Sequence, residues 1–140
     1  MISHVSDVTI KAWGPCLSDV FVQMSKGMWS LMFEDRVVSS QEKWSVEVHA
    51  MDAEELLVNF LNEQILLLEV QDLVVSDIDE IVIEQVGTSQ SPLGHQFHLR
   101  SIMLGSRLSQ ANIQPEIQIK AATFHEIQVA PTYAQVTFDV

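Results

Sequence analysis

The chain has 140 residues, of which 47% are hydrophobic, and its 7 basic and 19 acidic side chains give a net charge of −12. A chain of this length can bury about two thirds of its unfolded surface in one core, so we expect a single domain spanning residues 1–140. The charge argues against direct, tight binding of nucleic acid, because such binding depends on contacts from Lys and Arg to phosphates.

No apolar run approaches the roughly 20 residues that a transmembrane helix needs, so we expect no membrane association. The first ten residues contain no Lys or Arg and include Asp7, which is unlike a signal peptide. Cys16 is the only cysteine, so no disulfide can form within the chain. These features together favour a cytoplasmic protein.

The first half of the chain alternates between strand and helix patterns. Residues 8–13 alternate apolar and polar side chains, which predicts a strand, and residues 44–50 predict a second one in the same way. Between them, apolar positions from 17 to 32 recur at steps of three and four, which indicates an amphipathic helix. Asp52 is the predicted N-cap of a second helix, with Glu55 in the capping-box position.

The second half is mostly strand-like. We predict strands at residues 78–86, 96–104, 117–130 and 133–140, a loop at 87–94, and at most a short helix within 105–115. Two main helices among several strands predict an α+β fold, namely a mixed β-sheet sandwich with both helices packed on one side.

The two ends of the chain carry candidate metal ligands. Asp7 lies on the polar face of the first predicted strand, Asp139 lies on the polar face of the last, and Val140 adds a terminal carboxylate. Terminal strands often pair within one sheet, and three converging carboxylates would favour a hard cation such as Ca²⁺ or Mg²⁺. Solvated aspartates at strand ends are the simpler interpretation, and spacing alone favours it.

The histidines do not predict a zinc site. His95 and His98 are three residues apart on a strand, which places them on opposite faces, and no Cys-x-x-Cys pair exists to complete such a site. His49 lies on the polar side of its strand and is expected to be exposed. The chain also lacks a Gly-x-Ser-x-Gly elbow, a Gly-rich phosphate loop and a His-Glu-x-x-His motif. We therefore do not expect an enzyme.

Five short motifs follow one another along the whole chain, namely His4-Val-Ser-Asp7, Ala12-Trp13-Gly14-Pro15, Phe60-Leu61-Asn62-Glu63-Gln64, Lys120-Ala-Ala-Thr-Phe-His125 and Phe138-Asp139-Val140. Together they resemble the motifs of the archease family. Two motif positions differ, at Val5 and Ser6, and an acidic residue common in the family is replaced by Gln118. The region 105–115 also lacks the Glu, Asp and His usual there.

The resemblance implies a non-enzymatic activator of an RNA ligase that joins 3′-phosphate or cyclic-phosphate ends to 5′-hydroxyl ends. It implies that the chain promotes metal-dependent guanylylation of that ligase and its multiple turnover, in tRNA splicing or RNA repair. The family's metal site falls on Asp7, Asp139 and Val140, with Ca²⁺, Mg²⁺ or Mn²⁺ as the divalent cation. The motif lysine falls on Lys120, which would contact the partner or a phosphate.

Two alternative functions stay open at this point. The family has also been linked to tRNA methyltransferases, which would make the chain a chaperone or specificity modulator of such an enzyme. A small metal-dependent hydrolase is a third hypothesis, and it would need His4 or His125 as a general base beside the Asp7 and Asp139 carboxylates.

Overall fold

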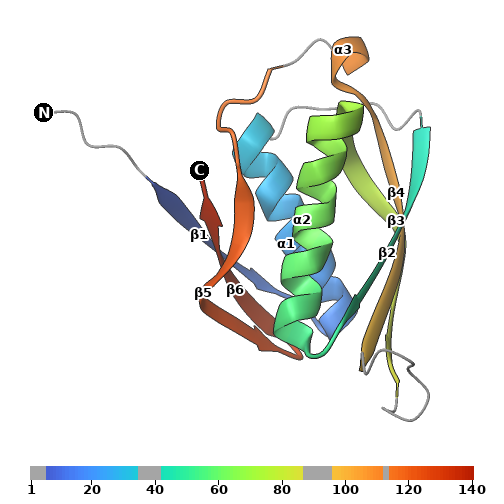
Figure 1. The fold of residues 1–140 in the computed structure, drawn as a ribbon, viewed down its shortest axis with the longest axis vertical. Helices are drawn as coiled ribbons and strands as arrows, with labels where there is room; N and C mark the ends of the chain where they lie inside the picture. The colour runs from blue at the N-terminus through green and yellow to red at the C-terminus, as the bar shows by residue number, and fades with distance from the viewer. Residues whose placement is uncertain (1–5, 35–41, 87–95, 112–113) are drawn as a thin grey trace, which may run out of the picture.

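The computed structural model describes residues 6–34, 42–86, 96–111 and 114–140. The strands form two three-stranded sheets, with the orders β1-β6-β5 and β2-β4-β3. In chain order the elements are β1 (Asp7–Trp13), α1 (Leu17–Phe33), β2 (Glu42–Ala50), α2 (Ala53–Gln71), β3 (Leu73–Gln85), β4 (Phe97–Arg107), α3 (Leu108–Ala111), β5 (Ala121–Ala130) and β6 (Tyr133–Asp139) (Figure 1).

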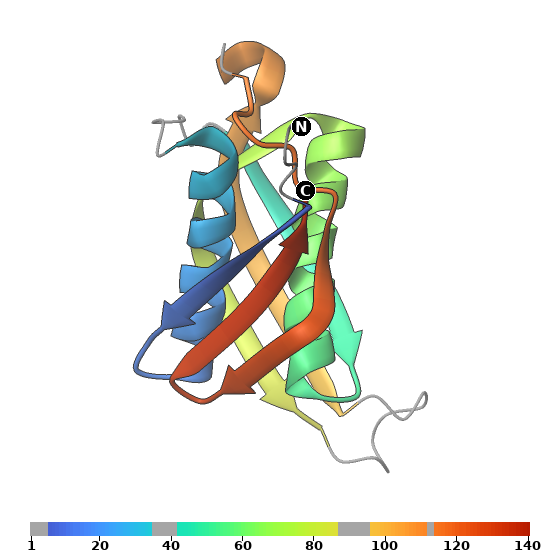
Figure 2. The same ribbon diagram turned by 90° about the vertical axis from the view of Figure 1, so that its left-hand side faces the viewer.

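The two long helices lie between the two sheets, and each helix contacts both (Figures 1 and 2). The predicted α+β class and the two main helices are confirmed, and the chain forms one domain in which the helices cover one face of each sheet. All strand pairs are antiparallel, whereas a mixed sheet was expected. The crossover through α2 does make β2 and β3 parallel, but β4 inserts between them, so no parallel neighbours result.

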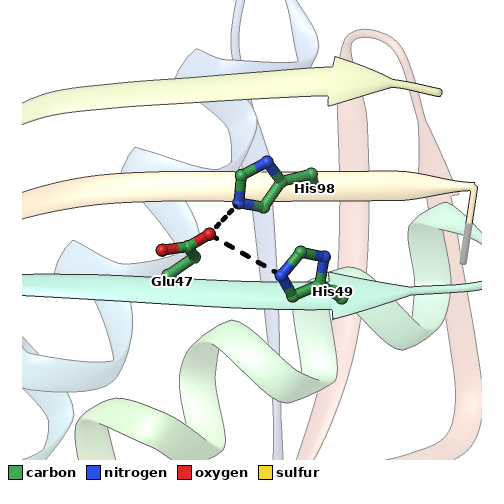
Figure 3. A group of neighbouring side chains, drawn as sticks. All are labelled: Glu47, His49 and His98. Atoms are coloured by element: carbon green, nitrogen blue, oxygen red, sulfur yellow. Dashed lines mark hydrogen bonds and ion pairs between the residues drawn. The ribbon is translucent and has the colours of Figure 1, made fainter. Parts of the chain in front are cut away.

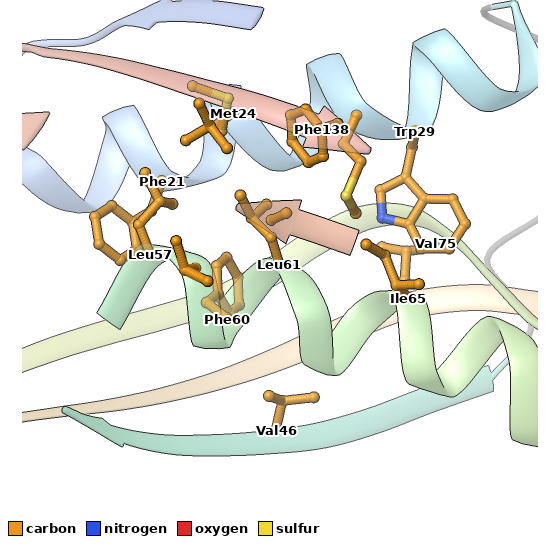
Figure 4. Close-up of a cluster of buried hydrophobic side chains, with 14 of the residues drawn as sticks. Phe21, Met24, Trp29, Val46, Leu57, Phe60, Leu61, Ile65, Val75 and Phe138 are labelled. Atoms are coloured by element: carbon orange, nitrogen blue, oxygen red, sulfur yellow. The ribbon is translucent and has the colours of Figure 1, made fainter. Parts of the chain in front are cut away.

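The core fills the space between the layers with side chains from both helices and both sheets (Figure 4). The predicted apolar stripe of α1 is buried, and Phe21 of α1 stacks on Phe60 of α2 with ring centroids 6.1 Å apart. Phe138 of β6 is fully buried on one side of the helices and Val46 of β2 is buried on the other. Each helix therefore has two apolar contact surfaces, one for each sheet.

Helix α2 begins and ends as its sequence indicates. The Glu55 backbone N–H donates to Asp52 Oδ1 at 2.8 Å, which confirms the predicted N-cap. The helix ends at Asp72, which adopts the left-handed conformation (φ 60°), and its N–H donates to carbonyls of the last turn. Because this single residue makes the turn, β3 starts at Leu73, five residues before the predicted strand.

Other element boundaries differ from the predictions by a few residues. Strand β4 continues to Arg107, and the described residues that follow it include the four-residue α3, in agreement with the prediction of a short helix at most. Strand β5 starts at Ala121 rather than at residue 117. The predicted loop at 87–94, together with His4 and His95, lies outside the described residues. None of the described helices combines the length and the apolar character that crossing a membrane requires.

Candidate functional site

Strand pairing brings the two ends of the chain together. Asp7 of β1 and Asp139 of β6 are direct partners in the antiparallel register, and the ribbon shows the start of β1 beside the C-terminus (Figure 2). The Val140 N–H donates to the Ser6 carbonyl at 3.2 Å, which makes that adjacent pair a hydrogen-bonded one. Since the two kinds of pair alternate, Asp7 and Asp139 form a non-hydrogen-bonded pair, in which side chains approach most closely, with Cα atoms about 4.5 Å apart.

The same ladder shows which face of the sheet holds these carboxylates. Two residues along, the hydroxyls of Thr9 and Thr137 hydrogen-bond across the strands at 2.9 Å, as expected for close partners on one face. The intervening Phe138 points the other way and is fully buried against the helices. Asp7 and Asp139 therefore project from the outer face of the sheet, and both are exposed.

Val140 follows Asp139 directly, so the last residue lies beside the same pair of aspartates. Among the residues that the structure describes, the donors brought together at this end of the sheet are oxygens; Asp7 and Asp139 are exposed, and Val140 is half-buried. This donor set fits a hard divalent cation that keeps part of its hydration, and it does not fit a metal that prefers sulfur or imidazole. The predicted ligands Asp7, Asp139 and Val140 are thus brought together by the fold; the bound cation itself stays a prediction.

The backbone of Lys120 lies next to this cluster. Its N–H donates to the Asp139 carbonyl at 2.7 Å, one residue before β5 pairs with β6. Lys120 also lines a groove beside α2, together with Asn62 and Glu63. The exposed Lys120 therefore borders both the carboxylate pair and the surface of α2.

Asn62 of α2 explains why the chain enters β5 at this place. Its amide makes two hydrogen bonds to the backbone of Ala122, accepting from N–H at 2.7 Å and donating to the carbonyl at 3.2 Å. The side chain thus occupies the open edge of β5 as a neighbouring strand would. This contact joins two of the sequence motifs, Phe60-Leu61-Asn62-Glu63-Gln64 and Lys120-Ala-Ala-Thr-Phe-His125, and fixes Lys120 beside Asp139.

His125, one of the two histidines considered as a general base, does not lie beside the carboxylate pair. His125 lies four residues beyond Ala121 on β5, where the register is interrupted, and its imidazole is exposed beside Glu126 at 3.8 Å. Within the described segments, no histidine or cysteine joins Asp7 and Asp139 in a cluster. His4 lies outside the described residues. A general base beside the carboxylates is therefore not among the residues that the structure describes.

Sequence reasoning missed a second group of ligand-type side chains, namely Glu47, His49 and His98. Along the sequence, the histidine nearest to His98 is His95, and His49 is a single histidine on the polar side of its strand. The relevant relation is the pairing of β2 with β4, in which His49 and His98 are direct partners. The alternation of each strand gave the correct face for each residue, but nothing in a single sequence gives this register.

Comparison with known proteins agrees with the motifs. The model of the Archease protein family matches residues 1–140. The chain belongs to the archease family.

Named relatives of this archease family member cover most of its length. It is 27% identical over 126 residues to the "Protein archease" of Thermococcus gammatolerans, a match that covers 90% of this chain and 83% of that protein. It is 28% identical over 131 residues to the "Protein archease-like" of Drosophila melanogaster, covering 91% and 77%.

The archease fold is also found in a solved structure. The solution structure of Methanobacterium thermoautotrophicum protein 1598 superposes with a TM-score of 0.74 at 21% identity, covering 99% of this chain and 96% of that one. This likeness supports the two-sheet fold. Archeases act as protein cofactors, and family membership is consistent with such a role for this chain.

Proposed function

We propose that the chain activates an RNA ligase that joins 3′-phosphate or cyclic-phosphate ends to 5′-hydroxyl ends. In this proposal it promotes the metal-dependent guanylylation of the ligase and its repeated turnover, in tRNA splicing or RNA repair. The observation that carries the proposal is the pairing of Asp7 with Asp139 on an exposed sheet face, within a chain whose whole length matches the archease family.

The charge of the chain favours a protein partner over direct RNA binding. With a net charge of −12, the surface repels a polyanion overall but is complementary to a basic active site that binds phosphates. Electrostatic complementarity of this kind makes association fast and sensitive to salt. The chain would thus reach RNA chemistry through the ligase.

Each residue of the site has a role that its chemistry supports. Asp7, Asp139 and the Val140 carboxylate would hold a divalent cation, with Ca²⁺, Mg²⁺ and Mn²⁺ as candidates. When bound, such a cation supplies positive charge that neutralises phosphate oxygens. Lys120, an exposed cation one residue from the pairing of Ala121 with Asp139, would pair with a phosphate or with an acidic group of the ligase.

Added Ca²⁺ is expected to raise the melting temperature of the protein. At 100 times the dissociation constant, a ligand stabilises the native state by about 2.7 kcal/mol, which corresponds to roughly 5–10 °C in a domain of this size. An Asp139→Asn variant should lose most of this rise because it removes a paired carboxylate. The measurement is differential scanning fluorimetry over a Ca²⁺ titration.

The matched control for this titration is Asp79→Asn, which removes one exposed carboxylate from the other sheet. Asp79 lies 3.7 Å from Lys43 and far from β6 in the topology. Its Ca²⁺ response should equal that of the wild type. Equal responses of all three proteins would show that the cation site is wrongly placed.

Activation of a ligase should also depend on the paired aspartates. With ligase in limiting amount, GTP and a divalent metal, the wild-type chain is expected to raise ligated product beyond one equivalent of ligase. Asp7→Ala and Asp139→Ala should abolish this gain, and Lys120→Ala should weaken it, while Asp79→Ala should activate fully. The assay is a time course of ligated RNA resolved on a denaturing gel.

The aspartate variants separate two ways in which activation can fail. Loss of turnover in Asp7→Ala with retained binding to the ligase would support cation delivery by the site. Full activity of Asp7→Ala would contradict the role of the carboxylates while leaving activation by docking intact. Absence of any gain with wild-type protein would contradict the proposed function as a whole.

A further inference from the structure

Glu47, His49 and His98 form a compact group on the outer face of the β2-β4-β3 sheet (Figure 3). Glu47 and His49 are two residues apart on β2, so they share a face, and His98 is the direct partner of His49 on β4. Their buried neighbours Val46, Val48 and Leu99 point the other way, into the core. The three side chains therefore project together on the face away from the helices.

The geometry of the group brings donor atoms close together. His98 Nε2 lies 2.5 Å and His49 Nε2 lies 3.7 Å from the same Glu47 oxygen. The two imidazole rings stack almost parallel, with centroids 4.3 Å apart and an angle of 4° between planes. One ligand atom from each residue lies within 4.8 Å of the other two.

We propose that these three residues form a second divalent metal site, selective for a transition metal such as Zn²⁺, on the face of the sheet opposite to the helices. Two imidazoles and one carboxylate are a ligand set that Zn²⁺ uses in proteins, with bond lengths of about 2.0–2.2 Å. Donors on one tetrahedral ion then lie about 3.3 Å apart. Because the lone pair of a ring nitrogen lies in the plane of its ring, His49 must rotate out of its parallel stack on His98 for both nitrogens to bind one ion.

The surroundings of the group allow such rotations. The side chains of Glu47 and His49 are 58% and 49% exposed, so they can move without disturbing the core, whereas His98 is only 20% exposed and is held in place. Three protein ligands leave one position of a tetrahedral ion for solvent. The nearby Arg100 faces Glu47 across the strands and lies 3.7 Å from Glu84, so this cation has an acidic partner of its own.

This site differs from the carboxylate pair at the chain ends in both place and chemistry. It lies on the other sheet and contains nitrogen ligands, which favour borderline transition metals, whereas Asp7 and Asp139 offer only oxygen. The inference does not depend on the proposed ligase activation. A chain that fails to activate a ligase can still bind Zn²⁺ here.

The test is direct measurement of Zn²⁺ binding by calorimetry on the full chain, checked by competition with a chromophoric chelator. Wild-type protein is expected to bind one Zn²⁺ at this site, and His49→Ala and His98→Ala should each weaken that binding by at least tenfold, since even outer partners of metal ligands contribute 10–100-fold. Glu47→Gln, which keeps the size of the side chain, provides a variant whose folding is not at risk.

Two controls locate the site. The first is His125→Ala, which removes an exposed imidazole from the other sheet. The second combines Asp7→Asn with Asp139→Asn and removes the carboxylate pair. Both proteins should bind Zn²⁺ with the affinity of the wild type. Excess Ca²⁺ should not displace the Zn²⁺. Unchanged Zn²⁺ affinity in His49→Ala, His98→Ala and Glu47→Gln, or no binding by the wild type at 1:1 stoichiometry, would overturn the proposal.

Discussion

A Gly105→Ala variant is expected to be destabilised by roughly 3 kcal/mol or more, at the upper end of what an added methyl group costs in a packed interior. A Cβ atom at position 105 would lie 2.0 Å from the Val74 carbonyl oxygen and 3.0 Å from its carbon. Both are backbone atoms of β3, so no side-chain rotation relieves the overlap. The strand pair β3-β4 would have to separate next to the irregularity between Val75 and Asp77.

The effect of Gly105→Ala can be measured by urea unfolding followed by circular dichroism. A loss of about 3 kcal/mol is a large part of the 5–15 kcal/mol that stabilise a typical domain. Ser106→Ala is the matched control, because it changes the next residue of β4 and removes a buried hydroxyl that has no hydrogen-bond partner among the described residues. That variant should be neutral or slightly stabilised. Equal stability of both variants would contradict the steric argument.

The sequence predicted well those features that depend on residues close together along the chain. The alternation in β1 and β6 placed Asp7 and Asp139 on polar faces, and the cap at Asp52 marked the start of α2. These predictions rest on the 2.0 and 3.6 periodicities of strands and helices, which a single sequence displays. The prediction that the two chain ends meet needed one further assumption, namely that the terminal strands pair. The register of β1 with β6 confirms this pairing.

Features that depend on contacts between distant segments were not predictable in this way. The insertion of β4 between β2 and β3 left only antiparallel neighbours in that sheet, and it also created the His49–His98 pair. Gly105 is a single glycine in a strand pattern, which indicates a bulge or a close approach of backbone. Only the pairing of β3 with β4 in the folded chain shows that the backbone of Gly105 lies close to the backbone of Val74.

Gln64 illustrates the same limit for a polar residue in a helix. It lies four residues after Phe60, so the helical period places it on the apolar face of α2, where it interrupts the hydrophobic pattern. The structure shows that it is completely buried and joins the two helices. Its Oε1 accepts hydrogen bonds from Ser25 Oγ at 2.7 Å and from Trp29 Nε1 at 2.8 Å, both on α1.

A Gln64→Leu variant is therefore expected to lose about 2–5 kcal/mol of stability, although leucine is apolar and similar in size. The substitution leaves the Ser25 hydroxyl and the Trp29 N–H buried without their acceptor, and each unsatisfied group costs about 1–3 kcal/mol. Gln71→Leu is the control at an exposed position of the same helix, where Gln71 Oε1 accepts from Trp44 Nε1 at 3.3 Å. It should change stability by less than about 0.5 kcal/mol.

A double-mutant cycle separates the hydrogen-bond argument from a simple packing defect. Ser25→Ala in the Gln64→Leu background removes one of the two orphaned donors, so the double variant should be destabilised by less than the sum of the two single variants. An interaction energy of about 1 kcal/mol or more is expected for groups in direct contact. Strict additivity, measured by urea unfolding of all four proteins, would show that Gln64 stabilises the helix pair by filling space alone.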